Sequence, residues 1–300
     1  MALILPADVA ALNVAASMQY QAAFAAVAPW YQTLATQISI GTTSARFPFI
    51  PDQDVMRQWV GARVVRDVEA QVFNVIPAKF EKTVQIERDD YLDQQMAGFQ
   101  MAMANMGTAA AKWPDQRVVA EIIANNVCYD ALSFYNLNHP LDPAGVQANT
   151  GTLALTAANY AITREAMLAF TGADGMPLSV NPNLLVVPPQ LERQGKEILI
   201  ADIITDPGGV GTAGVSNVNK GSASLMVLPE LAVAAGTWYL FDVSKPIKPY
   251  VFVLREAPIF VSKQSPDDDE VFWNDRLTWG VQSRGEAAPT LWHLGYRQVT

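Results

Sequence analysis

Charged residues are scarce in this sequence, and that scarcity limits what the protein can be. Only 16% of the 300 residues are charged, against about 25% in a typical soluble domain, while 50% are hydrophobic. A monomer with this composition would expose a large apolar surface, so burial in an assembly is expected. The net charge of −9 argues against dedicated DNA binding, because duplex affinity comes mainly from clustered Lys and Arg.

Cysteine is almost absent as well. The single cysteine, Cys128, excludes an internal disulfide and a cysteine-rich zinc site, and we interpret it as a buried core residue. The sequence has no uninterrupted apolar run of about 18 residues, and its N-terminus lacks the positive charge that begins a secretory signal. It therefore predicts no membrane span and no export.

Motifs for nucleotide or metal binding are weak. Gly209 to Gly214 match the dinucleotide glycine pattern, but Asp206-Pro207 precedes them in place of a strand and more loop follows in place of a helix. No Gly-Lys-Ser or Gly-Lys-Thr occurs, which excludes the usual phosphate loop. The acidic run Asp267 to Glu270 lacks the alternating ligands and turn glycine of a calcium loop, so a solvated turn is expected. We predict no cofactor and no metal.

The two histidines lie far apart in the sequence, with no partnering motif. His139 precedes Pro140 and is expected to hydrogen-bond a turn, while His293 is interpreted as a core residue. A nucleophile pair of Cys128 and His139 would need the fold to bring them together, and no oxyanion element is visible. The sequence predicts no catalytic residue.

The stretch from Phe80 to Asn126 is expected to be the central structural element of the chain. Phe80 to Ile86 alternate with the period of two that predicts a half-buried strand, and a long helical pattern follows. Its apolar residues recur at steps of three and four and predict one packing face, the spine face: Leu92, Met96, Phe99, Met103, Met106, Ala110 and Trp113. Pro114 fits the first turn of a following helical segment, so the pattern resumes through residues 118–123 with a kink. A helix of about 35 residues would be about 50 Å long, which suits a part that spans a subunit and meets neighbours.

Two contrasting segments precede this stretch. Residues 1–45 are rich in alanine, with Asp8 as the one charged residue, and predict a helix that either starts the core or lies as an arm across a neighbouring subunit. Residues 46–88 are dense in charges of both signs. With strands expected at Val60 to Val65 and Phe80 to Ile86, they predict a hairpin. A lone hairpin is marginal in water, so we favour docking on an adjacent subunit over an ordinary surface hairpin.

The remainder of the chain predicts an α/β or α+β lobe. Helices are expected at Ala158 to Phe170 and Gln190 to Ala201, around a buried strand at Leu184 to Pro188. Residues 138–152 and the glycine-rich residues 206–222 predict loops. Further strands are expected at Cys128 to Tyr135, Ser224 to Val227, Trp238 to Phe241, Tyr250 to Arg255, as a pair within Val271 to Arg284, and at Leu291 to Tyr296.

Several segments together resemble the major head subunits of Mu-like tailed phages, in the order of that family. They are Met56 to Arg63, Phe80 to Asp90, Pro114-Asp115 before Val118, Cys128 to Asp130 leading to His139-Pro140, Leu185 to Glu192, Trp238 to Asp242, and Thr278 to Arg284. The resemblance covers roughly Met1 to Tyr296. Ala131 departs from it, since the family commonly has glycine there. The chain also begins with the arm and no long charged leader, so we expect a separate scaffolding protein.

The resemblance implies an α+β fold of the HK97-like capsid type. Its parts would be an N-terminal arm (1–45), an extended β-hairpin loop (46–88), a peripheral domain with a long spine helix (89–152), an axial domain (153–249), and a return to the peripheral domain with a closing axial strand (250–300). Contacts between subunits are expected at the following residues: Trp59, Arg63, Arg66, Lys79, Glu81 and Lys82.

The function that the resemblance implies is structural, that of a major capsid protein and not an enzyme. The chain would self-assemble as hexamers and pentamers into the icosahedral head of a virion, in the host cytoplasm. Its other partners would be a scaffolding protein and a portal protein, with a decoration protein as a further candidate and packaged DNA contacted non-specifically. A non-viral nanocompartment shell and, less favoured, a cytoplasmic nucleotide-binding enzyme are the alternatives.

Overall fold

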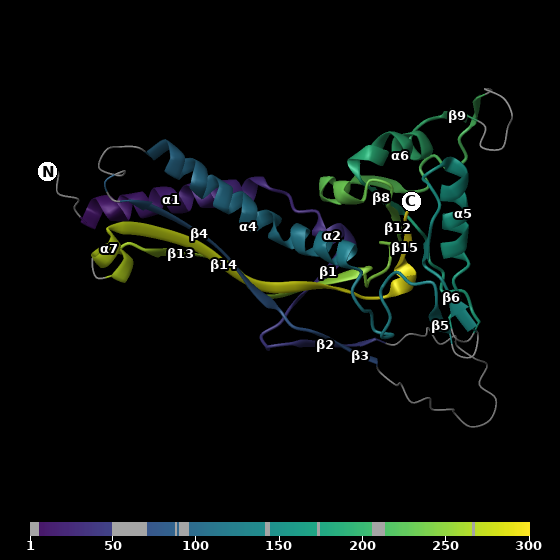
Figure 1. Ribbon diagram of the computed structural model, residues 1–300, viewed down its shortest axis with the longest axis horizontal. Helices are drawn as coiled ribbons and strands as arrows, with labels where there is room; N and C mark the ends of the chain where they lie inside the picture. Colours follow the sequence, from purple (N-terminus) through teal and green to yellow (C-terminus); the bar gives the residue numbers. More distant parts are fainter. Residues whose placement is uncertain are drawn as a thin grey trace.

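A four-stranded sheet runs along one half of an elongated molecule, with a smaller mixed lobe at the other end (Figure 1). The computed structural model describes residues 6–49, 71–87, 89, 96–141, 145–172, 175–205, 214–265 and 268–300, and the architecture given below is that of these residues. The strand order is β1-β13-β14-β4, with β1 parallel to β13 and the other pairs antiparallel. The strands are β1 (Ala35–Ser39), β4 (Ala78–Glu87), β13 (Tyr250–Lys263) and β14 (Arg276–Pro289).

The predicted spine helix lies along this sheet as α4 (Met96–Ala124). Its 29 residues correspond to a length of about 44 Å. The helix continues through Pro114, as predicted. Asn125 ends it with a φ of +52°, a left-handed conformation that asparagine tolerates, and the Asn125 side chain bonds both the N–H and the C=O of Tyr135.

The spine face is confirmed over most of its length. Five of its members are buried: Phe99, Met103, Met106, Ala110 and Trp113. Met96 begins the helix, and Leu92 lies outside the described residues. The pattern continues through Val118, Val119 and Ile122, whereas Ile123 is 45% exposed and does not belong to the buried face.

The N-terminal helix α1 (Pro6–Ala26) packs along α4 of its own chain. Leu12, Ala16 and Tyr20 are buried in one cluster with the first half of the spine face. The two helices meet closely at Gly107, where an added Cβ would lie 2.3 Å from the carbonyl oxygen of Tyr20. Within this chain, α1 is therefore a core helix, which was one of the two interpretations; contact with a neighbouring subunit stays a prediction.

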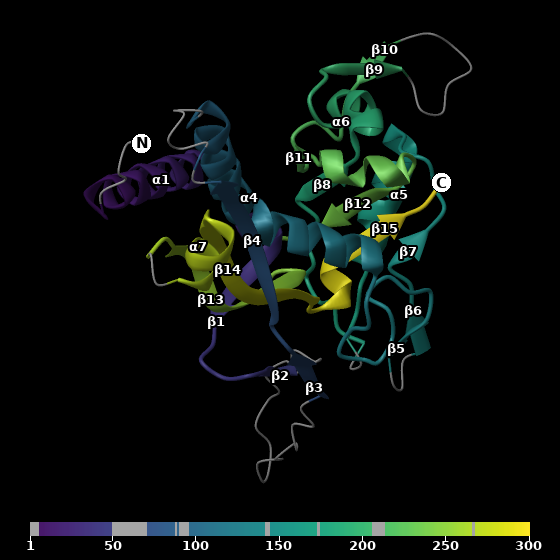
Figure 2. The same ribbon diagram turned by 60° about the vertical axis from the view of Figure 1, so that its left-hand side comes forward.

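The lobe is built on a five-stranded sheet, in the order β11-β8-β12-β15-β7. Its central strands β8 and β12 are buried at every position, and the helices α5 and α6 lie beside the sheet (Figure 2). The elements are β7 (Thr150–Gly151), α5 (Ala157–Leu168), β8 (Leu184–Val187), η1 (Pro189–Leu191), α6 (Glu192–Leu199), β11 (Ser224–Val227), η2 (Pro229–Ala234), β12 (Trp238–Phe241) and β15 (Gly295–Gln298). The predicted helices and the buried strand are thus confirmed, although the strand ends at Val187, before Pro188, and α6 is shorter than the expected helix at 190–201.

One hydrophobic core joins the lobe to the long part. The second half of the spine, with Trp113 and Val118, belongs to the same buried cluster as Leu185 of β8 and Phe252 of β13. The short helix α2 (Tyr31–Leu34) is fixed to α4 because the Tyr31 N–H donates to Asp115 Oδ1 at 2.7 Å. The lobe and the spine therefore form one folded body.

The expected hairpin differs from the observed one. Phe80 to Ile86 is a strand, as predicted, but as β4 it pairs with β14 because its apolar residues pack under the spine. The observed hairpin instead pairs β2 (Ala45–Phe49) with β3 (Gln71–Val75), and it projects below the long sheet in both views (Figures 1 and 2). Val60 to Val65 lies outside the described residues.

Three other strand or loop predictions were wrong in part. Cys128 to Tyr135 forms turns, with one isolated bridge, because side chains hold this loop in place of a sheet. Residues 138–152 contain β5 (His139–Leu141), β6 (Gly145–Gln147) and β7, and the end of the glycine-rich segment pairs as β10 (Gly214–Ser216) with β9 (Ile203–Thr205).

The C-terminal predictions also need correction. The expected strand pair within residues 271–284 is a short helix, α7 (Asp269–Asn274), followed by β14 as one long strand. The last strand begins later than predicted, because the turn η3 (Trp292–Leu294) precedes β15. Tyr250 to Arg255 is a strand, but β13 continues to Lys263.

Candidate functional site

The residues that could have formed a catalytic pair have other partners. The Cys128 thiol donates to the carbonyl oxygen of Thr290 at 2.7 Å, and burial raises the pKa of this thiol far above its ordinary value. His139 Nδ1 lies 2.5 Å from Asp130 Oδ2, and its Nε2 lies 3.2 Å from both Asn149 Oδ1 and the carbonyl oxygen of Phe134. A neutral, buried thiol bonded to a carbonyl is not a nucleophile.

His139 instead belongs to a closed polar joint between the loop after α4 and the C-terminal strand. Asn149 is fully buried and donates from Nδ2 to the carbonyl oxygens of Phe134, Trp292 and Gly295. The His139 ring stacks on Trp292 with centroids 4.2 Å apart. We call His139, Asp130, Asn149 and Trp292 the lobe joint. Its groups satisfy one another, so it has a structural role.

His293 is buried, as predicted. Burial lowers its pKa to about 4, with the nearby Lys245 adding to the effect, so the imidazole is neutral at physiological pH. Among the described residues no group of three or more His, Cys, Asp or Glu side chains is arranged to hold a metal ion. No helix in the described part of the chain has the length and hydropathy needed to cross a membrane. Gly209 to Ala213, the centre of the glycine pattern, lies outside the described residues.

The expected subunit contacts fall into two groups. Trp59, Arg63 and Arg66 lie outside the described residues. Lys79, Glu81 and Lys82 lie on β4, all three exposed. Within the described residues β4 is an edge strand of the long sheet, so one row of its backbone hydrogen-bonding groups faces outward. Such an edge is a natural place for another chain to dock.

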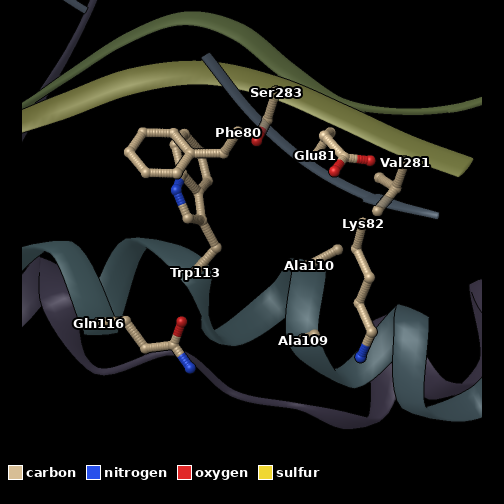
Figure 3. Close-up of a pocket in the computed structure, with 9 residues that line it drawn as sticks. All are labelled: Phe80, Glu81, Lys82, Ala109, Ala110, Trp113, Gln116, Val281 and Ser283. Carbon is tan, nitrogen blue, oxygen red and sulfur yellow. The ribbon is translucent and has the colours of Figure 1, made fainter. Parts of the chain in front are cut away.

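A groove opens between this edge strand and the spine helix (Figure 3). Its volume is about 250 Å³. The residues that line it come from β4, α4 and β14: Phe80, Glu81, Lys82, Ala109, Ala110, Trp113, Gln116, Val281 and Ser283. We call it the spine groove. Although Trp113 is only 7% exposed, its indole Nε1–H has no acceptor among the described residues.

Large apolar side chains are also exposed outside the groove. Val14 and Met18 lie one turn apart on the free face of α1, 59% and 65% exposed, and Trp273 on α7 is 75% exposed. The composition had indicated such a surface. Large exposed apolar side chains also occur in the lobe, for example Val218 at 88% and Val233 at 82%.

Sequence reasoning missed the charged groups that are partly or fully buried at the spine. Arg117 donates from Nε and Nη2 to Glu286 Oε1 at 2.8 and 2.6 Å, and its guanidinium lies over the Phe80 ring. Glu121 is 6% exposed, and burial raises the pKa of its carboxyl to about 7. The sequence gave only a weak signal for these buried charges. It consists of charged residues at helical spacing in the second half of α4, where most of the other residues on that face are apolar.

The comparison with protein families decides what kind of subunit this is. The family described as "Mu-like prophage major head subunit gpT" matches residues 9–153, 147–231 and 232–299. The chain belongs to this family. It is similar to the major capsid protein of Escherichia phage Mu, with 22% identity over 295 residues, covering 97% of this chain and 73% of that protein. It is also similar to the Mu-like prophage FluMu major head subunit of Haemophilus influenzae, with 21% identity over 298 residues, covering 99% and 74%.

Solved structures agree on the fold. The procapsid subunit of bacteriophage JBD30 matches with a TM-score of 0.59 and 26% identity, covering 99% of this chain and 76% of that one. A virus-like particle from Pyrococcus furiosus matches with a TM-score of 0.52 and 12% identity, covering 95% and 98%, which shows the shared fold alone. The chain is therefore a major capsid protein of a phage head with the HK97-like α+β fold, and its place is the virion shell.

Proposed function

We propose that copies of this chain form the hexamers and pentamers of a closed icosahedral head, without carrying out any reaction. The observation that supports this most is the position of β4 at the edge of the sheet formed by the described strands, beside the spine groove, in a chain of the major head subunit family. A shell subunit must bury such edges and apolar faces against other subunits. Assembly would then be driven by burial across many symmetric interfaces.

The parts of the chain would share this work as follows. Residues 1–45 form the arm, 46–88 the extended loop, 89–152 and 250–300 the peripheral domain with its closing axial strand, and 153–249 the axial domain. The expected subunit contacts are Trp59, Arg63, Arg66, Lys79, Glu81 and Lys82. The exposed charges on β4 support Lys79, Glu81 and Lys82 as contacts. An exposed charge stays hydrated when the subunit folds, and it can pair with an opposite charge across an interface.

Other proteins would complete the head. A separate scaffolding protein would set the curvature of the shell, a portal protein would occupy one vertex, and a decoration protein is a further candidate, because the JBD30 capsid is described as decorated with minor capsid protein trimers. The net charge of −9 suits a container that holds DNA without gripping it.

Electron microscopy and sedimentation of the purified protein test the proposal. We expect closed shells, or capsomers that close into shells when the scaffolding protein is added. Replacing Trp59 or Arg63 with alanine is expected to reduce assembly while the amount of soluble folded subunit stays the same, because these side chains are proposed to act between subunits. Strictly monomeric protein in both conditions, or equal loss of folded subunit in the variants, would contradict it.

A non-viral nanocompartment shell is less supported than a phage head, because the matching family and both named relatives are phage or prophage head proteins. The neighbouring genes discriminate the two, since a phage head gene lies beside portal, terminase and scaffolding genes. A nucleotide-binding enzyme is the third, and calorimetry with dinucleotides is expected to show no heat of binding.

A further inference from the structure

The strand β4 has the residues of a strand that can pair with a copy of itself. It is ten residues long, and it lies at one edge of the sheet that the described strands form. None of its residues is buried, as expected of a strand with an open side. We infer that β4 of one subunit pairs antiparallel with β4 of a second copy of this chain, about a two-fold axis through Thr83. This inference rests on the proposed assembly and names one of its contacts.

Backbone geometry limits where the two-fold axis can lie. In an antiparallel pair, residues that lie opposite each other either both hydrogen-bond across the pair or both turn these groups away. Along β4, alternate residues therefore direct their backbone groups to β14 and to the open edge. An axis between two residues would place one of each kind in opposition, so the axis must pass through a residue. The axes through Lys82 and Thr83 pair most of the strand, Ala78 to Ile86 in the first case and Lys79 to Glu87 in the second.

The side chains favour the axis through Thr83. An axis through Lys82 would place this lysine directly opposite its own copy, and like charges in that position destabilise a pair of strands. An axis through Thr83 places this threonine opposite its own copy instead. Threonine pairs are among the favourable cross-strand pairs. The residues of β4 therefore select the register that is centred on Thr83.

On the face of the sheet away from the spine, this register pairs opposite charges. Lys79 lies opposite Glu87 of the second copy, and the two-fold axis forms this pair twice. Lys79 is exposed and, among the described residues, has no ion pair with a carboxylate of its own chain. Glu87 has a 3.6 Å pair with Arg276 in which both groups are exposed, so it has room for a second cation. Glu81 lies opposite the uncharged Gln85 of the second copy.

On the spine side, the same register brings hydrophobic surface together. Phe80 lies opposite Ile86 of the second copy, and an aromatic residue with a β-branched one is a favourable cross-strand pair. The alkyl chain of Lys82 packs on Val84 of the second copy, while its Nζ can keep its bond to the carbonyl oxygen of Asn105. Phe80 and Lys82 line the spine groove, so the second β4 would lie beside the groove and help to cover it (Figure 3).

Self-complementarity is the reason to assign a second copy as the partner. An isologous contact requires that residue i meets residue j while residue j meets residue i. The residues of β4 meet this condition about Thr83 with opposite charges on one face and apolar pairs on the other. The pairing would join two four-stranded sheets into one of eight strands, which is within the usual size of a sheet.

A charge exchange tests the register. K79E and E87K each place like charges opposite each other twice in every contact, and each is expected to lower the assembled fraction about tenfold. The double variant K79E/E87K restores opposite charges and is expected to recover assembly. K263E is the matched control, because Lys263 is exposed on β13, two strands away from β4 in the same sheet, and this variant should assemble like the wild type. Urea unfolding of the subunits shows whether each variant folds.

Cross-linking tests the position of the axis. In assembled and oxidised T83C we expect a disulfide between copies, because directly opposite Cα atoms lie about 4.5–5.5 Å apart. Q85C is the control on the same face. Its cysteine would lie four positions from its own copy, about 13 Å along the strand, so no disulfide is expected. The buried Cys128 does not compete.

The outcomes separate this contact from the proposed function. The inference would be overturned by a disulfide in K82C or Q85C but not in T83C, or by a cross-link of T83C only to a different protein. Wild-type assembly of K79E, failure of K79E/E87K to recover, or an equal loss in K263E would overturn it as well. Failure of the wild type itself to assemble would instead contradict the proposed function.

Discussion

The lobe joint and the spine groove are both built around a buried aromatic residue and a polar group, yet they are opposite in kind. In the joint, Asn149 and His139 satisfy three carbonyls, a carboxylate and each other, so nothing is left for an outside partner. In the groove, the Trp113 N–H has no acceptor among the described residues and the neighbouring strand is an edge. A polar cluster that is closed within the chain stabilises the subunit, whereas a buried donor without an acceptor contributes less to its stability.

The largest effect is expected from opening the lobe joint with N149A. Three carbonyls would lose a donor and the backbone N–H of Asn136 would lose its acceptor, all close to buried residues. At about 1–3 kcal/mol for each unsatisfied buried group, we expect a loss of about 4 kcal/mol in the free energy of unfolding. Urea unfolding of the subunit measures it.

The matched control for that variant is N138A, since Asn138 is exposed and lies in the same loop. A loss for N149A no larger than that for N138A would show that the joint is not a closed network.

The second effect concerns the packing of α1 on the spine. In G107A the new methyl group would meet the Tyr20 carbonyl and displace α1 from α4, for a net loss of about 2–3 kcal/mol. G98A is its control, because it lies in the same helix with no atom within 4 Å of the added Cβ. That variant is expected to gain about 0.5–1 kcal/mol from helix propensity. If both variants change stability alike, then α1 is not held closely against α4 of its own chain.

Glu121 is buried, as the lobe joint is, but one of its carboxylate oxygens lacks a hydrogen-bond partner among the described residues, as the Trp113 N–H does. It is therefore intermediate between the lobe joint and the spine groove. Asn126 Nδ2 donates to its Oε2 at 2.8 Å, and Oε1 has no partner among the described residues. Burial is the main reason that its pKa rises from 4.5 to about 7. The folded state then binds more protons than the unfolded state between these values, so this group's contribution to stability is lost as the pH rises from 4.5 to 7.

E121Q tests this sign. The variant is expected to be more stable than the wild type by about 2 kcal/mol at pH 8, with the difference vanishing near pH 4.5, as judged by urea unfolding at both values. A variant that is less stable at pH 8 would show that the ionised carboxyl has a favourable partner.

The smallest effect on the subunit is expected at the free edge. Lys79 and Glu81 are exposed on β4, so K79A and E81A should change the free energy of unfolding by no more than about 0.5 kcal/mol. Assembly, followed by sedimentation velocity, should fall for both, because their proposed partners lie on another subunit. If K79A and E81A reduced the stability of the subunit but not its assembly, the edge strand β4 would stabilise the subunit, which is the role assigned to the lobe joint, and would not be a contact between subunits.

Local sequence patterns predicted the parts of the fold in which apolar residues recur with the same period over many residues. The spine face and β4 follow from steps of three and four and from strict alternation, and the all-apolar residues 184–187 form the buried strand β8. The charge content likewise indicated the exposed apolar surfaces. These patterns involve residues that are close together in the sequence, so they can be recognised without a structure.

The remainder depended on contacts between distant residues. The lobe joint connects Asn149 to Phe134 and Gly295, and the groove connects β4 to residues of α4 and β14. The expected strand pair within residues 271–284 was wrong because α7 occupies residues 269–274 and a single strand then runs from Arg276 to Pro289. The short helix α7 was read as a turn and a strand because its acidic residues are followed at once by apolar ones.

A map of the assembled particle by electron cryomicroscopy at side-chain resolution is the most direct test of this account. The account predicts a closed shell in which a neighbouring subunit covers the edge of β4 and fills the spine groove, while the lobe joint is unchanged from the isolated subunit. A particle in which β4 and Trp113 face solvent on every subunit, with the contacts made elsewhere, would contradict it.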